Sequence, residues 1–296
     1  MSLAATLLET YRVLKNGQIT QAMREQLTDP EVATAIDGLP NRVNDLGFDP
    51  WGLCPEDAKV YFSLAKRIAA YFRPQIHGIE KLPAGRVLVV PNHSGQLPFD
   101  GLVIAVACLL GARPPRLLRA QAERWVPTLP VVNEAFARCG VVLGDPINCR
   151  NLLLEENAIL VFPEGARGSG KPWRERYRLR QFGRGFMRLA LQTEAPIVPV
   201  AVIGAEESII SLHDGKPLAD LLGMPYLPIH PLLPLLGPLA YFPLPTKFHV
   251  HFGEPMHFTG PFDDEDPVID AKVEQVQGRV QQMIDEGLKA RTSLFF

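Results

Sequence analysis

The chain has 296 residues, of which 47% are hydrophobic and 21% are charged, and its formal net charge at pH 7 is -2. This apolar content allows a sizeable core and excludes a disordered chain. The nearly balanced charge argues against a nucleic-acid-binding protein, which usually carries a strong basic excess. The cysteines have neither metal-ligand nor CxxC spacing, so we expect reduced thiols in a cytosolic environment. They are Cys54, Cys108, Cys139 and Cys149.

Residues 1–75 predict an N-terminal helical region. The start of the chain lacks a basic stretch before its apolar run, which favours a short helix over a secretory signal. Helices are expected at residues 30–38 and 55–72, each with a proline at its first position. The helix expected at residues 55–72 carries an apolar stripe, which is typical either of a helix packed on its own core or of a membrane-surface helix. The longest apolar helical run, Leu102–Ala112, is far shorter than the roughly 20 residues of a membrane span.

From Arg86 onward, short β-branched runs alternate with helical segments, which is typical of an α/β domain. We therefore expect residues 76–296 to form an α/β domain with a mixed, mostly parallel sheet flanked by helices. The expected strands are Arg86–Val90, Arg116–Ala120, Ala158–Phe162, Pro196–Ile203 and Lys247–Phe252. The expected helices are Leu102–Gly111, Val126–Arg138, Gly183–Glu194 and about Pro267–Lys289.

The segment Leu221–Thr246 contains no Asp, Glu, Lys or Arg, and its many prolines forbid a regular helix or a central strand. Long loops in compact domains are usually functional or disordered, and the leucine content argues against disorder. Two interpretations remain: a lipid-facing lip that receives acyl chains, or a proline-rich excursion packed on the protein.

A first candidate site, Pro91-Asn92-His93-Ser94-Gly95-Gln96-Leu97-Pro98-Phe99-Asp100, directly follows an expected strand. Ligand sites of α/β folds lie at the carboxyl ends of strands. A neutral imidazole can take a proton from a hydroxyl near pH 7, and a carboxylate on its other nitrogen fixes the tautomer. Taken alone, His93 and Asp100 are also compatible with a histidine that has only a structural role.

A second candidate site follows the next apolar strand, where a Pro–Gly turn displays Glu164, Gly165 and Arg167. A run of basic residues from Lys171 to Arg188 comes next, opposed locally only by Glu175. Such a run is either a phosphate cradle or a solvated face. Further on, the proline in Ile197-Val198-Pro199-Val200 indicates a bulge or an edge strand.

In this order, Asn92-His93 with Asp100, Phe162-Pro163-Glu164-Gly165 and Ile197-Val198-Pro199-Val200 resemble the sequence blocks of the glycerolipid (lysophospholipid) acyltransferase superfamily, whose familiar member is lysophosphatidic acid acyltransferase. The resemblance covers about residues 85–205. It implies an acyl-CoA or acyl-carrier-protein donor, a hydroxyl acceptor, a histidine general base and an enzyme of the membrane surface.

Two features depart from that pattern. The family has four residues between its His and Asp, whereas this chain has six. On a regular helix such a pair would be about 10 Å apart, so Asp100 either returns to His93 through a looped turn or only caps the following helix. Residues 140–145 resemble a further block of the family but lack its phosphate-binding arginine. Arg138 and Arg150 are the candidates to replace it. The acceptor is therefore either a phosphate-bearing lipid or a neutral one, such as diacylglycerol or a long-chain alcohol.

The sequence thus predicts an O-acyltransferase that moves a fatty acyl group from an acyl thioester to a lipid hydroxyl. His93 is the expected general base and Asp100 its orienting partner, with backbone N–H groups at Ser94 and Gly95 stabilising the oxyanion. We expect a peripheral membrane protein on the cytoplasmic side, with no metal and no resident cofactor. The alternatives are an acyl thioesterase or lipid hydrolase, and a non-catalytic lipid-binding protein. The expected substrate-binding residues are Asn92, Ser94, Gly95, Glu164, Gly165, Arg167, Arg138 and Arg184.

Overall fold

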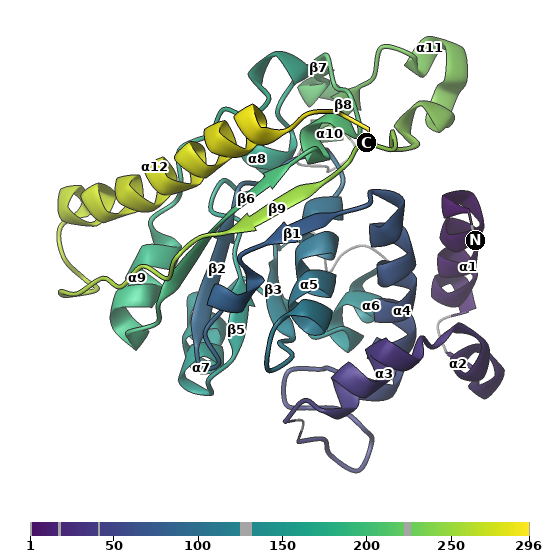
Figure 1. Cartoon of the computed structure of the whole chain (residues 1–296), viewed down its shortest axis with the longest axis horizontal. Helices are drawn as coiled ribbons and strands as arrows, with labels where there is room; N and C mark the ends of the chain where they lie inside the picture. The colour runs from purple at the N-terminus through teal and green to yellow at the C-terminus, as the bar shows by residue number, and fades with distance from the viewer. Residues whose placement is uncertain (1, 17–18, 41, 125–131, 222–225, 296) are drawn as a thin grey trace. The chain divides into compact units, whose positions relative to one another are not determined.

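The structure, a computed structural model, describes residues 2–16, 19–40, 42–124, 132–221 and 226–295 (Figure 1). Contacts divide the chain into two compact units, each of which mixes helices and strands. The first comprises Met1–Tyr71, Leu82–Val87 and Leu102–Leu160, and the second comprises Phe72–Lys81, Leu88–Gly101 and Val161–Phe296. The predicted boundary at residue 75 stays a prediction.

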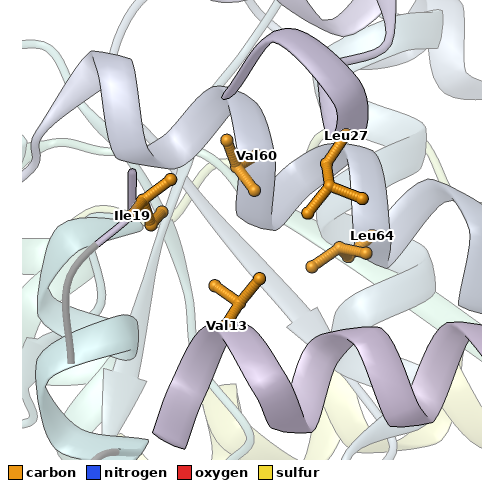
Figure 2. Close-up of a cluster of buried hydrophobic side chains, with 5 residues drawn as sticks. All are labelled: Val13, Ile19, Leu27, Val60 and Leu64. Carbon is orange, nitrogen blue, oxygen red and sulfur yellow. The ribbon is translucent and has the colours of Figure 1, made fainter. Parts of the chain in front are cut away.

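The N-terminal helices of the first unit pack around a central one. Helix α4 (Pro55–Tyr71) contacts α1 (Leu3–Asn16), α2 (Gln21–Leu27) and α3 (Pro30–Asp37). Helix α3 begins as the sequence predicts, because the Asp29 carboxylate caps two of its first N–H groups. Figure 2 shows the apolar side chains that α1, α2 and α4 bury against one another, together with Ile19: Val13, Ile19, Leu27, Val60 and Leu64.

The first unit also holds three parallel strands in the order β5–β3–β4. They are β5 (Ala158–Leu160), β3 (Leu118–Ala122) and β4 (Val142–Leu143). Its other helices are α6 (Val132–Arg138) and α7 (Pro146–Leu154), and most of α5 (Phe99–Gly111) belongs to it. The predicted helix start at Val126 lies outside the described residues.

Four strands form the sheet of the second unit, in the order β1–β9–β6–β2. They are β1 (Gln75–His77), β9 (His249–Phe252), β6 (Ile197–Ile203) and β2 (Val87–Pro91), and only the β6–β9 pair is antiparallel. The pairings within the two units confirm an α/β fold with mixed, mostly parallel strands flanked by helices. Of the two predictions for Pro199, a bulge or an edge strand, the edge strand is wrong, because β6 lies between β2 and β9. The Pro199 carbonyl accepts a hydrogen bond from Gly253 N–H.

Helix α12 (Asp266–Ala290) lies along β6 and β9 and also contacts α9 (Gly185–Thr193) (Figure 1). Its predicted apolar face is buried, which closes one side of this sheet. The buried side chains include Ile269, Val273, Val276, Val280, Met283 and Ile284.

The apolar proline-rich segment forms only short elements, as its prolines predict; residues 222–225 lie outside the described part. Strand β8 (Pro228–Ile229) pairs with β7 (His213–Asp214), and α11 (Leu233–Leu236) leads into η5 (Gly237–Tyr241). Across the described residues, no helix has the length and hydropathy required to cross a membrane. The remaining short helices are η1 (Ile79–Lys81), α8 (Ala166–Ser169), η3 (Trp173–Glu175), η4 (Ala205–Glu207) and α10 (Lys216–Leu221).

Candidate active site

The loop that leaves β2 brings the candidate base and its carboxylate together. His93 Nδ1 lies 2.8 Å from Asp100 Oδ2, which is hydrogen-bonding distance. The Asp100 side chain is fully buried, whereas 15% of the His93 side chain is exposed. Because Nδ1 is engaged by the carboxylate, Nε2 is the ring nitrogen that can accept a proton from another molecule.

The long spacing between these residues is spanned by a tight turn. Gly95 and Gln96 both have positive φ angles, 90° and 63°, and α5 then begins at Phe99. Asp100 therefore sits in the first turn of that helix, where the positive end of the helix dipole favours a carboxylate. Its Oδ2 also accepts from Ser94 N–H at 2.9 Å, and its Oδ1 accepts from Gly101 N–H at 2.7 Å. Asp100 therefore returns to His93 through a looped turn, and it stabilises the helix start as well instead of only capping the helix.

Asn92 fixes the start of the loop to the neighbouring strand. Its side-chain nitrogen donates to the Val202 carbonyl at 3.0 Å, and its Oδ1 accepts from Val202 N–H at 2.7 Å. Asn92 is fully buried, so this two-point clamp holds the backbone of β2 and β6 in register immediately before His93.

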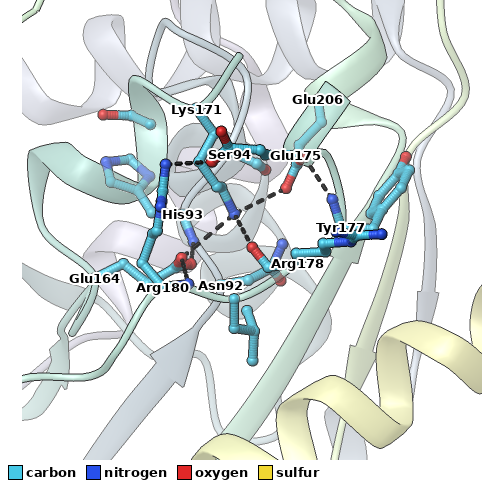
Figure 3. A network of polar contacts seen from close by, with 12 residues as sticks. Asn92, His93, Ser94, Glu164, Lys171, Glu175, Tyr177, Arg178, Arg180 and Glu206 are labelled. Carbon is cyan, nitrogen blue, oxygen red and sulfur yellow. Dashed lines mark hydrogen bonds and ion pairs between the residues drawn. The ribbon is translucent and has the colours of Figure 1, made fainter. Parts of the chain in front are cut away.

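Glu164 holds the backbone of His93 from the other side. Its Oε1 accepts from His93 N–H at 3.0 Å, and its Oε2 accepts from Arg180 N–H at 2.7 Å and from Lys171 Nζ at 3.3 Å (Figure 3). The Glu164 side chain is fully buried. This placement gives Glu164 contacts with the protein rather than with an acceptor headgroup.

Lys171 lies at the centre of this network, between two carboxylates (Figure 3). Its Nζ lies 3.1 Å from Glu206 and 3.3 Å from the Arg178 carbonyl, and its side chain is 1% exposed. Burial raises the pKa of Glu206 to about 7, although the positive charge of Lys171 acts in the opposite direction. The sequence places Lys171 in a basic run but gives no signal for Glu206, which lies on a different segment.

The imidazole ring of His93 packs on an aromatic side chain. Its centroid lies 4.0 Å from that of Phe162, and the rings are stacked. A Cβ at Gly168 would lie 2.6 Å from the Glu164 Cβ and 3.0 Å from the His93 Cβ, so glycine is required for this approach. A pocket beside the loop is lined by residues that include Gly95, Gln96, Gly168, Lys171, Trp173 and Arg176.

Four other predicted substrate-binding residues lie in the turns around this site. Ser94 is buried and its N–H is engaged by Asp100, so that donor is not directed at an oxyanion. Gly95 approaches Ala205, where a Cβ would meet the carbonyl at 2.7 Å. Gly165 has a φ of 58° and precedes α8, and Arg167 is exposed on that helix.

The predicted arginines outside these turns pair with carboxylates of the protein. Arg184 bonds Asp266 and Asp270 at the start of α12, with distances of 2.6 to 2.7 Å. Arg138 belongs to the first unit, where it pairs with Asp57 and Glu134. Within the second unit, Arg184 therefore binds the start of α12 and, among the described residues, makes no hydrogen bond to the His93 loop.

Residues 73–203 match the sequence model of the Acyltransferase family. An uncharacterized protein of Mycobacterium tuberculosis is 41% identical over 260 residues, which cover 86% of this chain and 72% of that protein. The chain therefore belongs to the acyltransferase family, as the sequence resemblance predicts.

The names of two more distant matches state an activity. A chicken protein named DGAT1/2-independent enzyme synthesizing storage lipids is 28% identical over 185 residues, covering 62% of this chain and 52% of that protein. The crystal structure of the 1-acyl-sn-glycerophosphate (LPA) acyltransferase PlsC from Thermotoga maritima superimposes with a TM-score of 0.55 at 18% identity, and the match covers 88% of both chains. This last similarity confirms the α/β fold.

Proposed function

We propose that this acyltransferase moves a fatty acyl group from an acyl thioester, acyl-CoA or acyl-carrier protein, to a lipid hydroxyl, with His93 as general base. The observation that carries the proposal is the 2.8 Å contact between His93 Nδ1 and Asp100, with the His93 side chain 15% exposed. It supports catalysis over lipid binding alone, because the long spacing between the two residues does not keep their side chains apart.

In the proposed reaction, His93 Nε2 takes the proton of the acceptor hydroxyl as its oxygen attacks the thioester carbonyl carbon. The C–S bond then breaks, and the proton passes from Nε2 to the leaving thiolate. Asp100 holds the imidazole in the required tautomer and stabilises the imidazolium that forms. The scheme uses the acyl thioester as a substrate and requires no resident cofactor.

The surrounding residues position this pair rather than contact the substrate. Asn92 fixes the backbone before His93 to β6, and Glu164 accepts from the N–H of His93 itself. Errors of about 1 Å in the position of a catalytic group can reduce rates a hundredfold, so such anchoring supports a catalytic role for the loop.

The acceptor is proposed to be a glycerolipid or another lipid alcohol. The names of the two distant relatives point to different acceptors, one a lysophosphatidate and the other a precursor of storage lipids. In this chain Arg138 and Arg184 are already paired with carboxylates, whereas Arg167 is exposed on α8, so the test includes both a phosphate-bearing acceptor and neutral ones.

We further propose that the protein binds the cytoplasmic side of a membrane peripherally, through the apolar segment around α11 and η5. Leu235 and Leu239 are 79% and 73% exposed, in a stretch that carries no charged residue. Exposed apolar patches of this kind mark interaction sites, and an acyltransferase with a lipid acceptor needs access to a bilayer.

The test is acyl transfer by the full chain with radiolabelled acyl-CoA and vesicles that contain lysophosphatidate, diacylglycerol or a long-chain alcohol. His93→Ala should reduce product formation by roughly 10²- to 10⁴-fold, the usual contribution of a general base. His257→Ala, which removes an exposed histidine elsewhere, is the matched control and should retain full activity.

Equal product from wild type and His93→Ala would remove His93 from the mechanism. Release of free CoA without an acylated lipid would identify the protein as a thioesterase. Vesicle binding that persists in His93→Ala, with no transfer by wild type, would identify a lipid-binding protein.

A further inference from the structure

Three histidines converge on one face of the second unit's sheet, on two strands that are distinct from the His93 loop. His249 and His251 are two positions apart on β9, so their side chains project from the same face. His77 lies on β1, directly opposite His251 in the parallel register. One potential ligand nitrogen from each ring lies within 4.8 Å of the others.

The chemistry of this cluster favours a metal ion over a set of ordinary surface histidines. The rings of His77 and His251 are stacked with centroids 4.6 Å apart, although protonated imidazoles would repel each other. Neutral imidazole is the form that binds metal ions.

One ring nitrogen of these three histidines is left without a protein partner in the described part of the chain. His249 Nε2 is buried and has no hydrogen-bond partner among the described residues. Buried polar atoms are nearly always paired, so an orphaned nitrogen indicates a missing ligand. Helix α12 passes over His251 at Gly287, where a Cβ would lie 3.2 Å from His251 Nε2. The same Cβ would lie 2.2 Å from Ile203 Cδ1, so glycine lets α12 pack closely over this part of the sheet.

We propose that His77, His249 and His251 bind a divalent transition-metal ion of the zinc class, with a solvent molecule as the fourth ligand. Three imidazoles suit Zn²⁺, Co²⁺ or Ni²⁺ rather than Mg²⁺ or Ca²⁺, which prefer oxygen ligands. Tetrahedral Zn–N bonds of about 2.0–2.1 Å place ligand nitrogens roughly 3.4 Å apart. Binding therefore requires the ligand nitrogens to approach one another by up to about 1.4 Å, which the exposed His77 on the edge strand β1 allows.

The proposed ion has a structural consequence, because it joins the edge strand β1 to β9 across two distant parts of the chain. A ligand that binds only the folded state stabilises it in proportion to its concentration and affinity. Charged groups of both signs surround the site. Lys247 and Arg291 act on His249, and Glu286 acts on His251.

The test uses full-length protein dialysed against EDTA and titrated with ZnCl₂ by calorimetry, and with CoCl₂ by visible absorption. We expect one equivalent of Zn²⁺ to bind, a tetrahedral Co²⁺ spectrum, and a higher melting temperature with Zn²⁺. His77→Ala and His251→Ala should each weaken Zn²⁺ binding at least tenfold and abolish the Co²⁺ spectrum, whereas His257→Ala should change neither.

His77 is exposed, so His77→Ala is expected to fold normally, which circular dichroism without metal will check. The proposal is overturned if wild type binds no stoichiometric Zn²⁺, or if His77→Ala binds it as tightly as wild type does. Neither outcome bears on acyl transfer, because none of the three histidines belongs to the His93 network.

Discussion

At the scale of single residues, the catalytic loop is held by hydrogen bonds to both its backbone and its side chains. His93 is anchored through its N–H by Glu164 and through Nδ1 by Asp100. Each carboxylate also accepts backbone N–H groups, which fixes the carboxylates themselves. His93 is thus presented by a loop whose backbone is firmly held, although Ser94 Oγ and Gln96 Oε1 are buried without a hydrogen-bond partner among the described residues.

Asp100→Asn tests whether the charge and orientation supplied by Asp100 matter. The carboxylate accepts three hydrogen bonds with two oxygens, whereas an amide has one oxygen and an NH₂ group that must face a donor. We expect kcat to fall by roughly 10²- to 10⁴-fold with little change in KM. Steady-state kinetics with acyl-CoA will measure both.

Asp145→Asn is the matched control, because Asp145 also caps a helix, α7, through a bond to Ile147 N–H. Asparagine caps helices about as well as aspartate, so this variant should keep wild-type kinetics. An Asp100→Asn enzyme within threefold of wild type would remove Asp100 from the mechanism.

The sequence predicts His93 and Asp100 but leaves the role of Asp100 open. The spacing excludes contact only on a regular helix, whereas the turn at Gly95 depends on close packing against Ala205, a residue far along the chain. From sequence, Glu164 is interpreted as a substrate-binding residue at a strand end, and Lys171 as part of a basic run that is either a phosphate cradle or a solvated face. Their burial depends on Glu206, and no local pattern encodes that tertiary contact.

At the scale of elements, the strong periodic patterns are predicted best. The long apolar stripe of α12 and the β-branched runs of β2 and β6 appear within one or two residues of the expected bounds. The strands β1 and β4 are missed, since three and two residues are too few for a periodic signal.

The apolar segment supports a prediction at this scale. Leu235→Glu with Leu239→Glu replaces two exposed leucines of α11 and η5. Burying a leucine in an apolar phase is worth about 1.5–3 kcal/mol, and each 1.4 kcal/mol is a factor of ten. We therefore expect the double variant to bind vesicles of phosphatidylcholine and phosphatidylglycerol at least tenfold more weakly in flotation assays.

Leu46→Glu is the control, since Leu46 is 81% exposed but lies in the N-terminal region. It should float with vesicles as wild type does. If the double variant also floats as wild type does, the segment is not the membrane-docking surface, and the helices of residues 1–71 become the next candidates.

At the scale of the whole molecule, the second unit includes a charged network in its interior. Lys171, Glu164 and Glu206 are each 5% exposed or less. Removing such charges from water is costly, and their attraction repays this cost only in part. Stability should therefore depend on the protonation of the most poorly compensated member, which is Glu206.

Glu206→Gln tests this dependence. The pKa of Glu206 is raised from 4.5 to about 7 in the folded protein, so the folded state holds this proton at a higher pH than the unfolded state does. The contribution of protonated Glu206 to the free energy of unfolding is fully present below about pH 4.5. This contribution is lost as the pH rises through about 7. The uncharged amide of the variant resembles the protonated carboxyl group at every pH. We expect the variant to match wild type near pH 5 and to become more stable near pH 8, by roughly 3 kcal/mol at most.

Urea unfolding midpoints measured from pH 5 to pH 8 will show the difference. Glu254→Gln, which removes a carboxylate that is 74% exposed, is the control and should stay within a few tenths of a kcal/mol of wild type throughout. A Glu206→Gln protein whose stability relative to wild type is independent of pH would mean that Lys171 fully compensates the buried charge. In that case the network would hold the His93 loop without any cost to the stability of the folded protein at neutral pH.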